Sequence, residues 1–444
     1  MGKNIRIELD DAYVDRLYEY FPEIGDSVDF CAYWFRIAQN NLKSDGRAGL
    51  VATSSIRQGK SRRAALDYLR DNGGHIHSAI SSQPWSGDAK VHVSIVNWSI
   101  QEPSRFYLDG EIVSSISTSL SSNLDTSKAL GLNANKGIAF QGVIPVGVDG
   151  FAISPEQAAD WIDSDPKCAE VLKPFLTADD LAAVPLATPR RWIIDFNNMT
   201  LEAAETYKAP FLHVKTYSKP FREDNRREVT RVYWWKFGEK RPAMREAIKA
   251  NGGAFCFPRH SKWFIPLTVA PLLLLPGDST TVIASSDLYI LAVLSSSPHR
   301  EWVNAQASTL KADIRYTHTS CFETFPFPQQ VDHAVVNALR RVMAELNTFR
   351  DEIMTQRNCG ITDLYKSYLA RPERRGLVDL EPASQLAKFH QALDALVLKA
   401  YGWKAREDIL SNLLDLNLEL AEREAAGETV VGPWAPGSHQ GRLP

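Results

Sequence analysis

The first residues of the chain carry a helix-like hydrophobic pattern. In 26–43 apolar side chains recur every three or four positions, which predicts an amphipathic helix. Its predicted buried face carries Phe30, Trp34, Ile37 and Ala38. This aromatic helix appears within thirty residues of the first methionine, before any strand pattern, so the chain is expected to begin inside a larger fold.

Strand patterns and a second helix follow this first helix. Residues 46–54 form a short apolar run after a glycine-bounded turn and predict a buried strand. A second helix is predicted over 60–74, where a pair of glycines ends it, and two more strands over 75–83 and 90–98. The order helix–strand–helix–strand–strand is typical of the last part of a doubly wound α/β sheet.

The middle of the chain shows a different pattern. Residues 111–128 are rich in serine and mark a domain boundary. From about 130 to 330, short strand-like runs alternate with turns, as in "GIAFQGVIPVGVDGFAIS" and "TTVIASSDLYILAVLSS", which predicts a mixed α+β domain. The most apolar run, 263–278, is interrupted by three prolines and is too short for a membrane helix, so it predicts buried strands and turns.

The last third of the chain is predicted to be helical. Apolar side chains recur at spacings of four and three over 335–353 and again over 386–400. Packing of these stripes within one helical domain is favoured over an intermolecular coiled coil, because three heptads are marginal for the latter. The predicted domains are therefore 1–110, 111–330 and 331–425, with a disordered tail at 426–444.

Composition is that of an ordinary folded protein, with 44% hydrophobic and 23% charged residues among 444. The five cysteines are far apart and form no C-x-x-C pair, so neither a metal site nor a disulfide framework is indicated, and a reducing cytoplasm is expected. His75, His77 and His92 all fall in strand patterns, where structural histidines are favoured over metal ligands.

The net charge of −3 hides a strongly basic segment. Residues 206–262 hold fourteen Lys and Arg against five Asp and Glu, interleaved with aromatic side chains. Cations that neutralise phosphates and rings that stack on bases are typical of nucleic-acid binding, whereas a solvated basic face over an aromatic core would give the same pattern. The candidate DNA-binding residues are Lys215, Lys219, Arg222, Arg226, Arg227, Arg231 and Lys236. The four arginines are expected in a polar loop and the aromatics in the core.

Several catalytic and nucleotide-binding motifs are absent from the sequence. It contains no glycine-rich nucleotide fingerprint after an early strand, no G-x-x-x-x-G-K-[ST], no H-E-x-x-H and no G-x-S-x-G. A nucleotide-binding beginning of a Rossmann sheet is therefore not part of this sequence.

The residues that remain resemble a known family. Residues 29–35, "GRAGLVATSSIRQGKSRRAALDYL" and "HIHSAISSQPWSGDAKVHVSIVNW" are similar to the later motifs of class I adenine-N6 DNA methyltransferases. "RRWIIDF" and "RYTHTSCFETFPFPQ" resemble the target-recognition domain of the MmeI-like (type IIG/IIL) restriction–modification methyltransferases and their phage-defence relatives. "ITDLYKSYL" and "LDALVLKAYGW" resemble the C-terminal helical region of that group.

The resemblance implies a fold and a chemistry. The fold would be the C-terminal part of a Rossmann-like methyltransferase sheet, then a mixed α+β target-recognition domain, then a helical C-terminal domain. Such enzymes bind S-adenosylmethionine at the first half of the sheet, flip an adenine out of the duplex and hold its N6 amine with an Asn-Pro-Pro-Phe motif. By position, Trp85 matches the aromatic that lines the flipped-base pocket, although a tryptophan capping the sheet edge is nearly as good a reading.

This chain departs from the family at the catalytic motif. It has no Pro-Pro dipeptide, so no catalytic residue is assigned to it, and S-adenosylmethionine binding by this chain alone is not expected. Met1 is expected to follow the catalytic motif directly, with the first half of the domain on a separately encoded partner. The predicted function is the DNA-binding, sequence-recognising part of a site-specific adenine-N6 methyltransferase, inactive on its own. The alternative is an inert DNA-specificity module or the product of a truncated gene.

Overall fold

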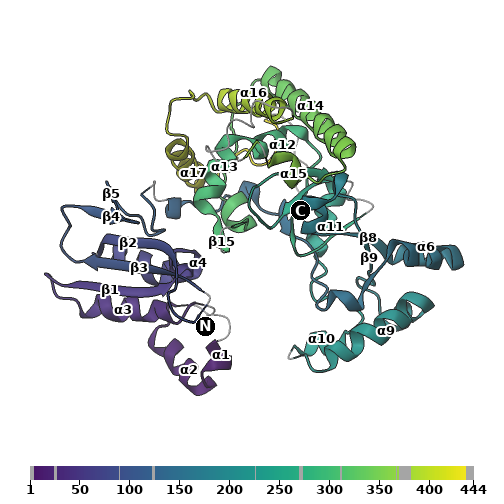
Figure 1. The fold of residues 1–444 in the computed structure, drawn as a ribbon, viewed down its shortest axis with the longest axis horizontal. Helices are drawn as coiled ribbons and strands as arrows, with labels where there is room; N and C mark the ends of the chain where they lie inside the picture. Colours follow the sequence, from purple (N-terminus) through teal and green to yellow (C-terminus); the bar gives the residue numbers. More distant parts are fainter. Residues whose placement is uncertain are drawn as a thin grey trace. The chain divides into compact units, whose positions relative to one another are not determined.

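The computed structural model describes residues 5–24, 28–89, 91–122, 126–225, 227–269, 274–310, 313–366, 368–369 and 382–436. The chain divides into two compact units, unit 1 (residues 1–128) and unit 2 (residues 129–444) (Figure 1). No helix in the described ranges is long and apolar enough to cross a lipid bilayer.

Unit 1 is built on one five-stranded sheet with helices packed against it. Its strands are β1 (Arg47–Thr53), β2 (His75–Pro84), β3 (His92–Ser99), β4 (Phe106–Leu108) and β5 (Glu111–Val113). Its helices are α1 (Ile5–Glu8), α2 (Asp11–Tyr20), α3 (Cys31–Asn41), α4 (Gly59–Arg62) and α5 (Tyr68–Asp71), the last two joined by a π-helical turn. The strand order is β1-β3-β2-β4-β5, so β1 lies at one edge. β3 is antiparallel to both of its neighbours, and β4 runs parallel to β2.

The core of unit 1 confirms the predicted helix–strand–helix–strand–strand order. Phe35 of α3 stacks on Trp98 of β3 with ring centroids 5.4 Å apart, and the Trp98 indole donates a hydrogen bond of 2.9 Å to Gln39. The helical segment that starts at α4 ends before Gly73, which adopts a positive φ of 79° that favours glycine. The hydrophobic spacing and the glycine pair therefore predicted these helices and strands correctly.

The predicted buried face of α3 is half right, because Phe30 and Ala38 pack against the core of this unit whereas Trp34 and Ile37 do not. The helix buries Ala32, Tyr33 and Phe35 against the sheet, whereas Trp34 is 53% and Ile37 37% exposed. Apolar residues occupy both sides of this helix, so the sequence could not tell which side faces the strands of this unit. An exposed tryptophan and isoleucine beside an edge strand form an apolar surface that no described residue of unit 1 covers.

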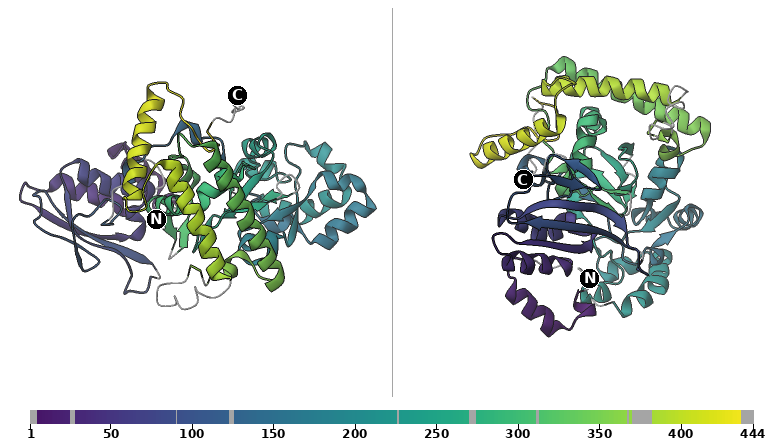
Figure 2. Two further views of the ribbon diagram at one scale, coloured as in Figure 1. Left: turned by 90° about the horizontal axis from the view of Figure 1, so that it is seen from above. Right: turned by 60° about the vertical axis from the view of Figure 1, so that its left-hand side comes forward.

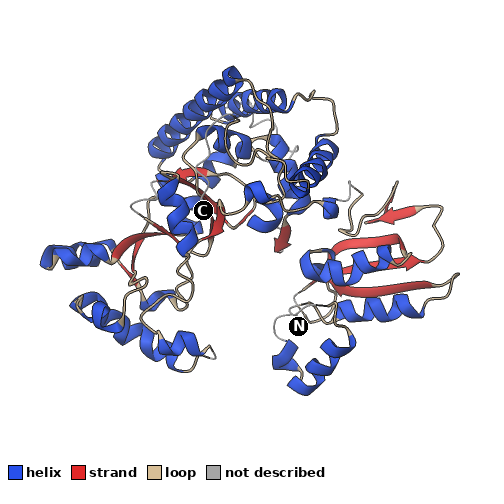
Figure 3. Cartoon of the chain, turned by 180° about the vertical axis from the view of Figure 1, so that it is seen from behind, coloured by secondary structure: helices blue, strands red, loops and turns tan. Residues whose placement is uncertain are grey.

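Unit 2 is an α+β unit with three small sheets (Figure 3). The strands of these sheets are β6 (Ala139–Gln141), β7 (Ala152–Ile153), β8 (Leu172–Leu176), β9 (Arg191–Ile194), β10 (Ala254–Pro258), β11 (His260–Ser261), β12 (Leu267–Val269), β13 (Leu275–Pro276), β14 (Thr280–Ile283), β15 (Ser308–Leu310) and β16 (Asp313–Arg315). The sheet orders are β12-β10-β14-β6, β11-β16-β15 and β13-β8-β9-β7.

The helices of unit 2 surround these sheets. They are α6 (Pro155–Ser164), α7 (Ala178–Ala183), α8 (Leu201–Glu205), α9 (Lys208–Glu223), α10 (Glu228–Val232), α11 (Pro242–Ala250), α12 (Leu288–Ser295), α13 (Ser297–Gln306), α14 (His333–Arg357), α15 (Ile361–Tyr365), α16 (Ala383–Tyr401) and α17 (Ile409–Ala425). α14 and α16 pack side by side and both contact α12 (Figure 2). The mixed α+β region and the helical C-terminal region are confirmed, and one continuous hydrophobic core joins them.

α12 corrects one reading of the sequence. "TTVIASSDLYILAVLSS" looks strand-like throughout, but only Thr280–Ile283 form a strand and Leu288–Ser295 form a helix. Its residues Tyr289 to Ser295 are all buried, so the helix is apolar on every side and lacks the amphipathic period. Asp287, whose carboxylate accepts a hydrogen bond of 2.9 Å from the Tyr289 N–H, was the available sign of a helix start.

Asp287 also ties α12 to the C-terminal helices, because its carboxylate accepts hydrogen bonds of 2.8 and 2.6 Å from Arg340 of α14. Burial alone would raise the pKa of Asp287, but the hydrogen bonds from Arg340 and Tyr289 outweigh it and lower that pKa below its ordinary value. We expect Asp287→Ala to lower the free energy of unfolding at pH 7 by about 2 kcal/mol. Since the folded-state pKa is depressed, this contribution is present above about pH 4 and is lost as the pH falls further.

Urea denaturation at pH 7 and pH 3 checks this prediction. Asp332→Ala is the matched control, because Asp332 caps α14 through the Ala334 N–H without an ion pair in the described structure. Equal losses for the two variants at pH 7 would contradict a contribution from the Arg340 pair.

The beginning of the C-terminal tail is ordered. Val430 and Ala435 are buried, and Gln329 exchanges two hydrogen bonds with the backbone of Val431, at 2.9 and 3.0 Å. The disorder expected for 426–444 is therefore not found over 426–436, and residues 437–444 lie outside the described ranges.

Candidate nucleic-acid interface

The basic segment is helical where a polar loop was expected. α9 runs for sixteen residues and continues past Pro220, and α10 begins at Glu228. α9 is held by one apolar face, on which Phe211, Val214 and Ser218 are buried, so packing outweighs the hydrogen bond that Pro220 removes. Figure 1 shows α9 and α10 together, near α6.

Arg222 is buried in the core of unit 2, whereas the sequence led us to expect it at the surface in contact with a DNA phosphate. Its side chain is fully buried and lies over the Phe151 ring, 4.7 Å from the centroid. The guanidinium donates to the carbonyl oxygens of Val146 (2.8 Å), Trp234 (3.1 Å) and Lys236 (2.5 Å), and also to that of Pro145. Burial lowers the pKa of Arg222 to about 10. A guanidinium enclosed by backbone carbonyls cannot reach a DNA backbone, so we remove Arg222 from the candidate contacts.

The other candidate DNA-binding cations differ in how far their side chains are exposed to solvent. Lys215, Arg227 and Arg231 are exposed. Lys219 and Lys236 are half-buried with their ammonium groups over aromatic rings, at 5.7 Å from the Trp234 centroid for Lys219 and 5.3 Å from the Trp235 centroid for Lys236. Burial, and then the charge of Lys240, lower the pKa of Lys236. Arg226 lies outside the described residues.

The aromatic side chains of the segment divide into two groups. The expectation that they fill the core is confirmed for seven of them, namely Tyr207, Phe211, Trp234, Trp235, Phe237, Phe255 and Phe257. Tyr217, Phe221 and Tyr233 are instead 60%, 63% and 45% exposed. Tyr217 and Phe221 are four residues apart on α9, as are Lys215 and Lys219, so each pair shares one side of the helix. We refer to Lys215, Lys219, Arg227 and Arg231 with these three rings as the α9–α10 surface.

Trp85 lies in unit 1, directly after β2. Its backbone N–H donates a hydrogen bond of 2.9 Å to Val91, and its side chain is 45% exposed. Gly87 leaves room for the indole, because a Cβ on that glycine would lie 2.6 Å from the Trp85 Nε1. The ring is thus presented on a short turn at the end of a strand, a position that suits stacking on a planar group.

A polar cluster at the carboxyl end of β1 received no role from the sequence. The Asp29 carboxylate accepts a hydrogen bond of 3.0 Å from the Thr53 hydroxyl and another from the Ser55 hydroxyl, and the Asp29 N–H donates one of 3.2 Å to Ser61. In open α/β sheets, ligands bind at the carboxyl ends of the strands. The nearness of Asp29 to β1 depends on contacts more than twenty residues apart in sequence, which no local motif could reveal.

Comparison with known proteins places these features in two domains. Residues 2–108 match the MmeI DNA-methyltransferase domain, and residues 133–329 match the MmeI target recognition domain. Two segments of the chain thus match domain models of the MmeI family. The resemblance seen in the sequence is therefore confirmed, with Trp85 and Asp29 in the MmeI methyltransferase domain and the α9–α10 surface in the MmeI target recognition domain.

Two relatives illustrate the extent of the likeness. DNA methyltransferase A of Bacillus subtilis (strain 168) is 25% identical over 424 residues, which are 90% of this chain and 44% of that protein. The solved structure of the type IIL restriction-modification enzyme MmeI in complex with DNA matches with a TM-score of 0.68 at 18% identity, over 89% of this chain and 53% of that one. At this identity the structural match supports the fold alone. The chain thus spans about half the length of the relatives it matches.

Proposed function

We propose that this chain is the sequence-recognising part of a site-specific DNA adenine-N6 methyltransferase of the restriction–modification or phage-defence type. Unit 2 binds double-stranded DNA through the α9–α10 surface, and unit 1 supplies the later strands of the methyltransferase sheet. The reaction takes place in the cytoplasm, where the DNA of such systems is found.

The observation that carries this proposal is the position of the α9–α10 surface within the MmeI target recognition domain. Exposed cations neutralise phosphates, and exposed rings between them stack on bases or sugars. A purely structural role would bury these rings, as the same segment does with its other aromatics. Three large rings left in solvent beside four cations suit a nucleic-acid ligand.

The residues of unit 1 do not fit S-adenosylmethionine by themselves. A cofactor loop in this type of sheet needs several glycines between a strand and the following helix, so that the backbone can approach the ligand. The connection from β1 to α4 contains Ser54 to Gln58 and no glycine before Gly59, which begins the helix. We therefore assign cofactor binding and the Asn-Pro-Pro-Phe motif to a further polypeptide segment.

The edge of β1 is the surface on which we place that segment. β1 pairs with β3 on one side and with no described strand on the other. Val51 on β1 is 49% exposed, and Trp34 and Ile37 of the neighbouring α3 are exposed as well. An open strand edge with apolar neighbours is the usual site for strand addition. The added strand belongs to the cofactor-binding half of the methyltransferase sheet, either upstream in the same protein or on a separate partner.

Methyl transfer to DNA tests the proposal. The purified chain is mixed with labelled S-adenosylmethionine and DNA, with and without a polypeptide that carries the cofactor loop and the Asn-Pro-Pro-Phe motif of an MmeI-type methyltransferase domain. We expect no transfer by the chain alone and site-specific N6-methyladenine in the mixture. DNA binding without any methylation in the mixture would favour the inert DNA-specificity module. Methyl transfer by the chain alone would contradict the proposal that the cofactor loop and the catalytic motif belong to a further segment.

The double variant Trp34→Ser and Val51→Thr tests the β1 edge separately. Both side chains are about half exposed in this unit, so we expect the stability of the chain to fall by no more than about 2 kcal/mol. Methylation in the mixture should fall about 30-fold at a limiting concentration of the added polypeptide, because truncating two apolar anchors at an interface costs about 1 kcal/mol or more each. Exposed Leu130 and Ile112, changed to Ser and Thr, form the matched control and should leave methylation unchanged. Unchanged methylation in the test variant would exclude this edge as the docking surface.

A further inference from the structure

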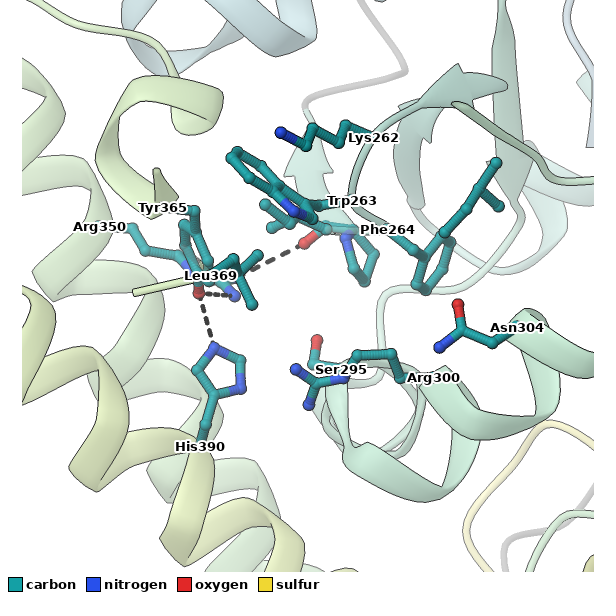
Figure 4. Close-up of a pocket in the computed structure, with 13 residues that line it drawn as sticks. Lys262, Trp263, Phe264, Ser295, Arg300, Asn304, Arg350, Tyr365, Leu369 and His390 are labelled. Carbon is teal, nitrogen blue, oxygen red and sulfur yellow. Dashed lines mark hydrogen bonds between the residues drawn. The ribbon is translucent and has the colours of Figure 1, made fainter. Parts of the chain in front are cut away.

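A cavity of about 120 Å³ lies within unit 2, between the 262–266 segment and the helices α13, α14 and α16 (Figure 4). It is separate from the α9–α10 surface and shares no residue with it. Lys262 and Trp263 lie on one side, Arg300 and Ser295 on another, and Arg350, Tyr365 and His390 on a third (Figure 4). No role in DNA recognition accounts for this cluster.

The cavity is strongly cationic. Three of its thirteen lining residues are Lys262, Arg300 and Arg350, and none is Asp or Glu. Arg350 is only 1% exposed, and its partners among the described residues are the Tyr365 hydroxyl and the Pro266 carbonyl oxygen. Buried guanidinium groups are ordinarily paired with an anion, because an unpaired buried charge is costly. Arg350 is buried without a carboxylate in its cavity, and the half-buried Arg300 has none there either, so this pair of cations points to a missing anionic partner.

Two carboxylates, Asp351 and Asp394, interact electrostatically with these arginines, but within the described ranges neither one neutralises them as an ion-pair partner. Arg350 lowers the pKa of Asp351 and Arg300 that of Asp394, yet burial raises both of these pKa values overall. Asp394 accepts a hydrogen bond of 2.7 Å from the Ser297 N–H, and in the described part of the chain neither carboxylate forms an ion pair with these arginines. Both acids also lie outside the cavity wall.

One buried polar group in the wall, the Ser295 hydroxyl, has no hydrogen-bond partner in the described structure. His390 Nδ1 is also buried and makes no hydrogen bond of good geometry, although the Ser295 backbone lies within reach of the imidazole ring and raises its pKa. The Tyr365 hydroxyl accepts from Arg350 (2.7 Å) and therefore donates its one hydrogen to His390 Nε2, at 2.8 Å. Burial, reinforced by the two arginines, lowers the pKa of His390 well below its ordinary value, so the ring is neutral. Its single proton must then sit on Nδ1, on the ring edge that faces Ser295 and Arg300 (Figure 4).

We propose that this cavity binds the phosphate group of a small molecule. Arg300 and Arg350 supply the charge, and the His390 Nδ1–H and the Ser295 hydroxyl supply neutral donors. A phosphate offers three acceptor oxygens and close to two negative charges, which matches this donor set better than a carboxylate does. Trp263, Ile314 and Leu369 provide an apolar rim for the rest of the molecule, so a nucleoside monophosphate suits the cavity as well as inorganic phosphate does.

Thermal unfolding and calorimetric titration of the full chain test this site. The probes are inorganic phosphate, adenosine monophosphate, adenosine, and sodium chloride at matched ionic strength. We expect both phosphates to raise the melting temperature and adenosine and chloride not to do so. If adenosine monophosphate binds more tightly than inorganic phosphate, the apolar rim contacts the nucleoside and the ligand is a nucleoside monophosphate. If both bind equally well, the ligand is free phosphate.

Two variants and a control locate the binding. Arg300→Gln should weaken phosphate binding about tenfold or more, and Ser295→Ala by a smaller factor, because a charge-assisted hydrogen bond contributes more than a neutral one. Arg341→Gln is the control, since Arg341 is exposed on α14 outside the cavity. Circular dichroism confirms that each variant is folded before titration. The proposal is overturned if neither phosphate binds, if Arg300→Gln binds as the parent does, or if only a DNA duplex engages Arg300.

Discussion

Replacement of Arg222 by glutamine is expected to lower the free energy of unfolding of unit 2 by about 3 kcal/mol or more. The guanidinium donates to four backbone carbonyl oxygens from two segments, 145–146 and 234–236, and thereby joins both segments to α9. A glutamine amide is shorter and has two N–H donors, so most of these buried acceptors would lose their partner. Urea denaturation followed by tryptophan fluorescence measures the loss, because Trp234 lies in the same contact.

Arg227→Gln is the matched control for this prediction. Arg227 is exposed and follows α9 by only a few residues, so its replacement should change stability by no more than about 0.5 kcal/mol. If Arg222→Gln were as stable as the parent and instead bound DNA more weakly, the buried position of Arg222 would be contradicted and its role as a phosphate contact restored.

Neutralising the four accessible cations of the α9–α10 surface is expected to have the largest effect on DNA binding. Changing Lys215, Lys219, Arg227 and Arg231 together to glutamine should weaken binding to duplex DNA about 100-fold near 50 mM salt. The slope of log affinity against log salt should become shallower by about 3–4, since each phosphate contact contributes about 0.9. Fluorescence anisotropy over a salt series measures both quantities.

A second variant with four substitutions tests whether the loss of DNA affinity comes from this surface or only from the lower net positive charge. Arg341 on α14, Lys388 and Lys399 on α16 and Lys404 after α16 are exposed cations, and their change to glutamine removes the same total charge. We expect this control to lose less than about threefold in affinity, because charges more than a Debye length from the ligand are largely screened. Equal losses for both variants would exclude the α9–α10 surface as the specific contact.

The sequence predicted most of the elements that depend on local pattern. Strands β1, β2 and β3 and the long helices α14 and α16 follow hydrophobic spacing, and Gly402 ends α16 with a positive φ as its position indicated. The short strands β4 and β5 were not predicted, and β5 lies in the segment that was assigned as a domain boundary. The predicted elements are specified by residues a few positions apart, which a single sequence displays. Family motifs extended this reading to the methyltransferase and target recognition domains.

Features that depend on distant residues could not be predicted in the same way. Arg222 stands in the charged stretch "FREDNRRE", which gives no sign of burial, and its carbonyl acceptors at 145–146 lie more than seventy residues away. α12 had no amphipathic period because it is covered on every side. Trp34 and Ile37 of α3 were assigned wrongly to its buried face because the sequence shows which residues are apolar, but not which apolar residues this unit itself covers.

The continuous core of unit 2 has a consequence for engineering new specificities. Residues from β6 to the ordered start of the tail contribute to one hydrophobic cluster, in which α14 and α16 pack against α12 of the target recognition domain. A transplant cut near residue 330 would expose that packed interface on both pieces and would require two unrelated surfaces to fit together. Recognition domains of this kind should therefore be exchanged between relatives as one block that includes the C-terminal helices.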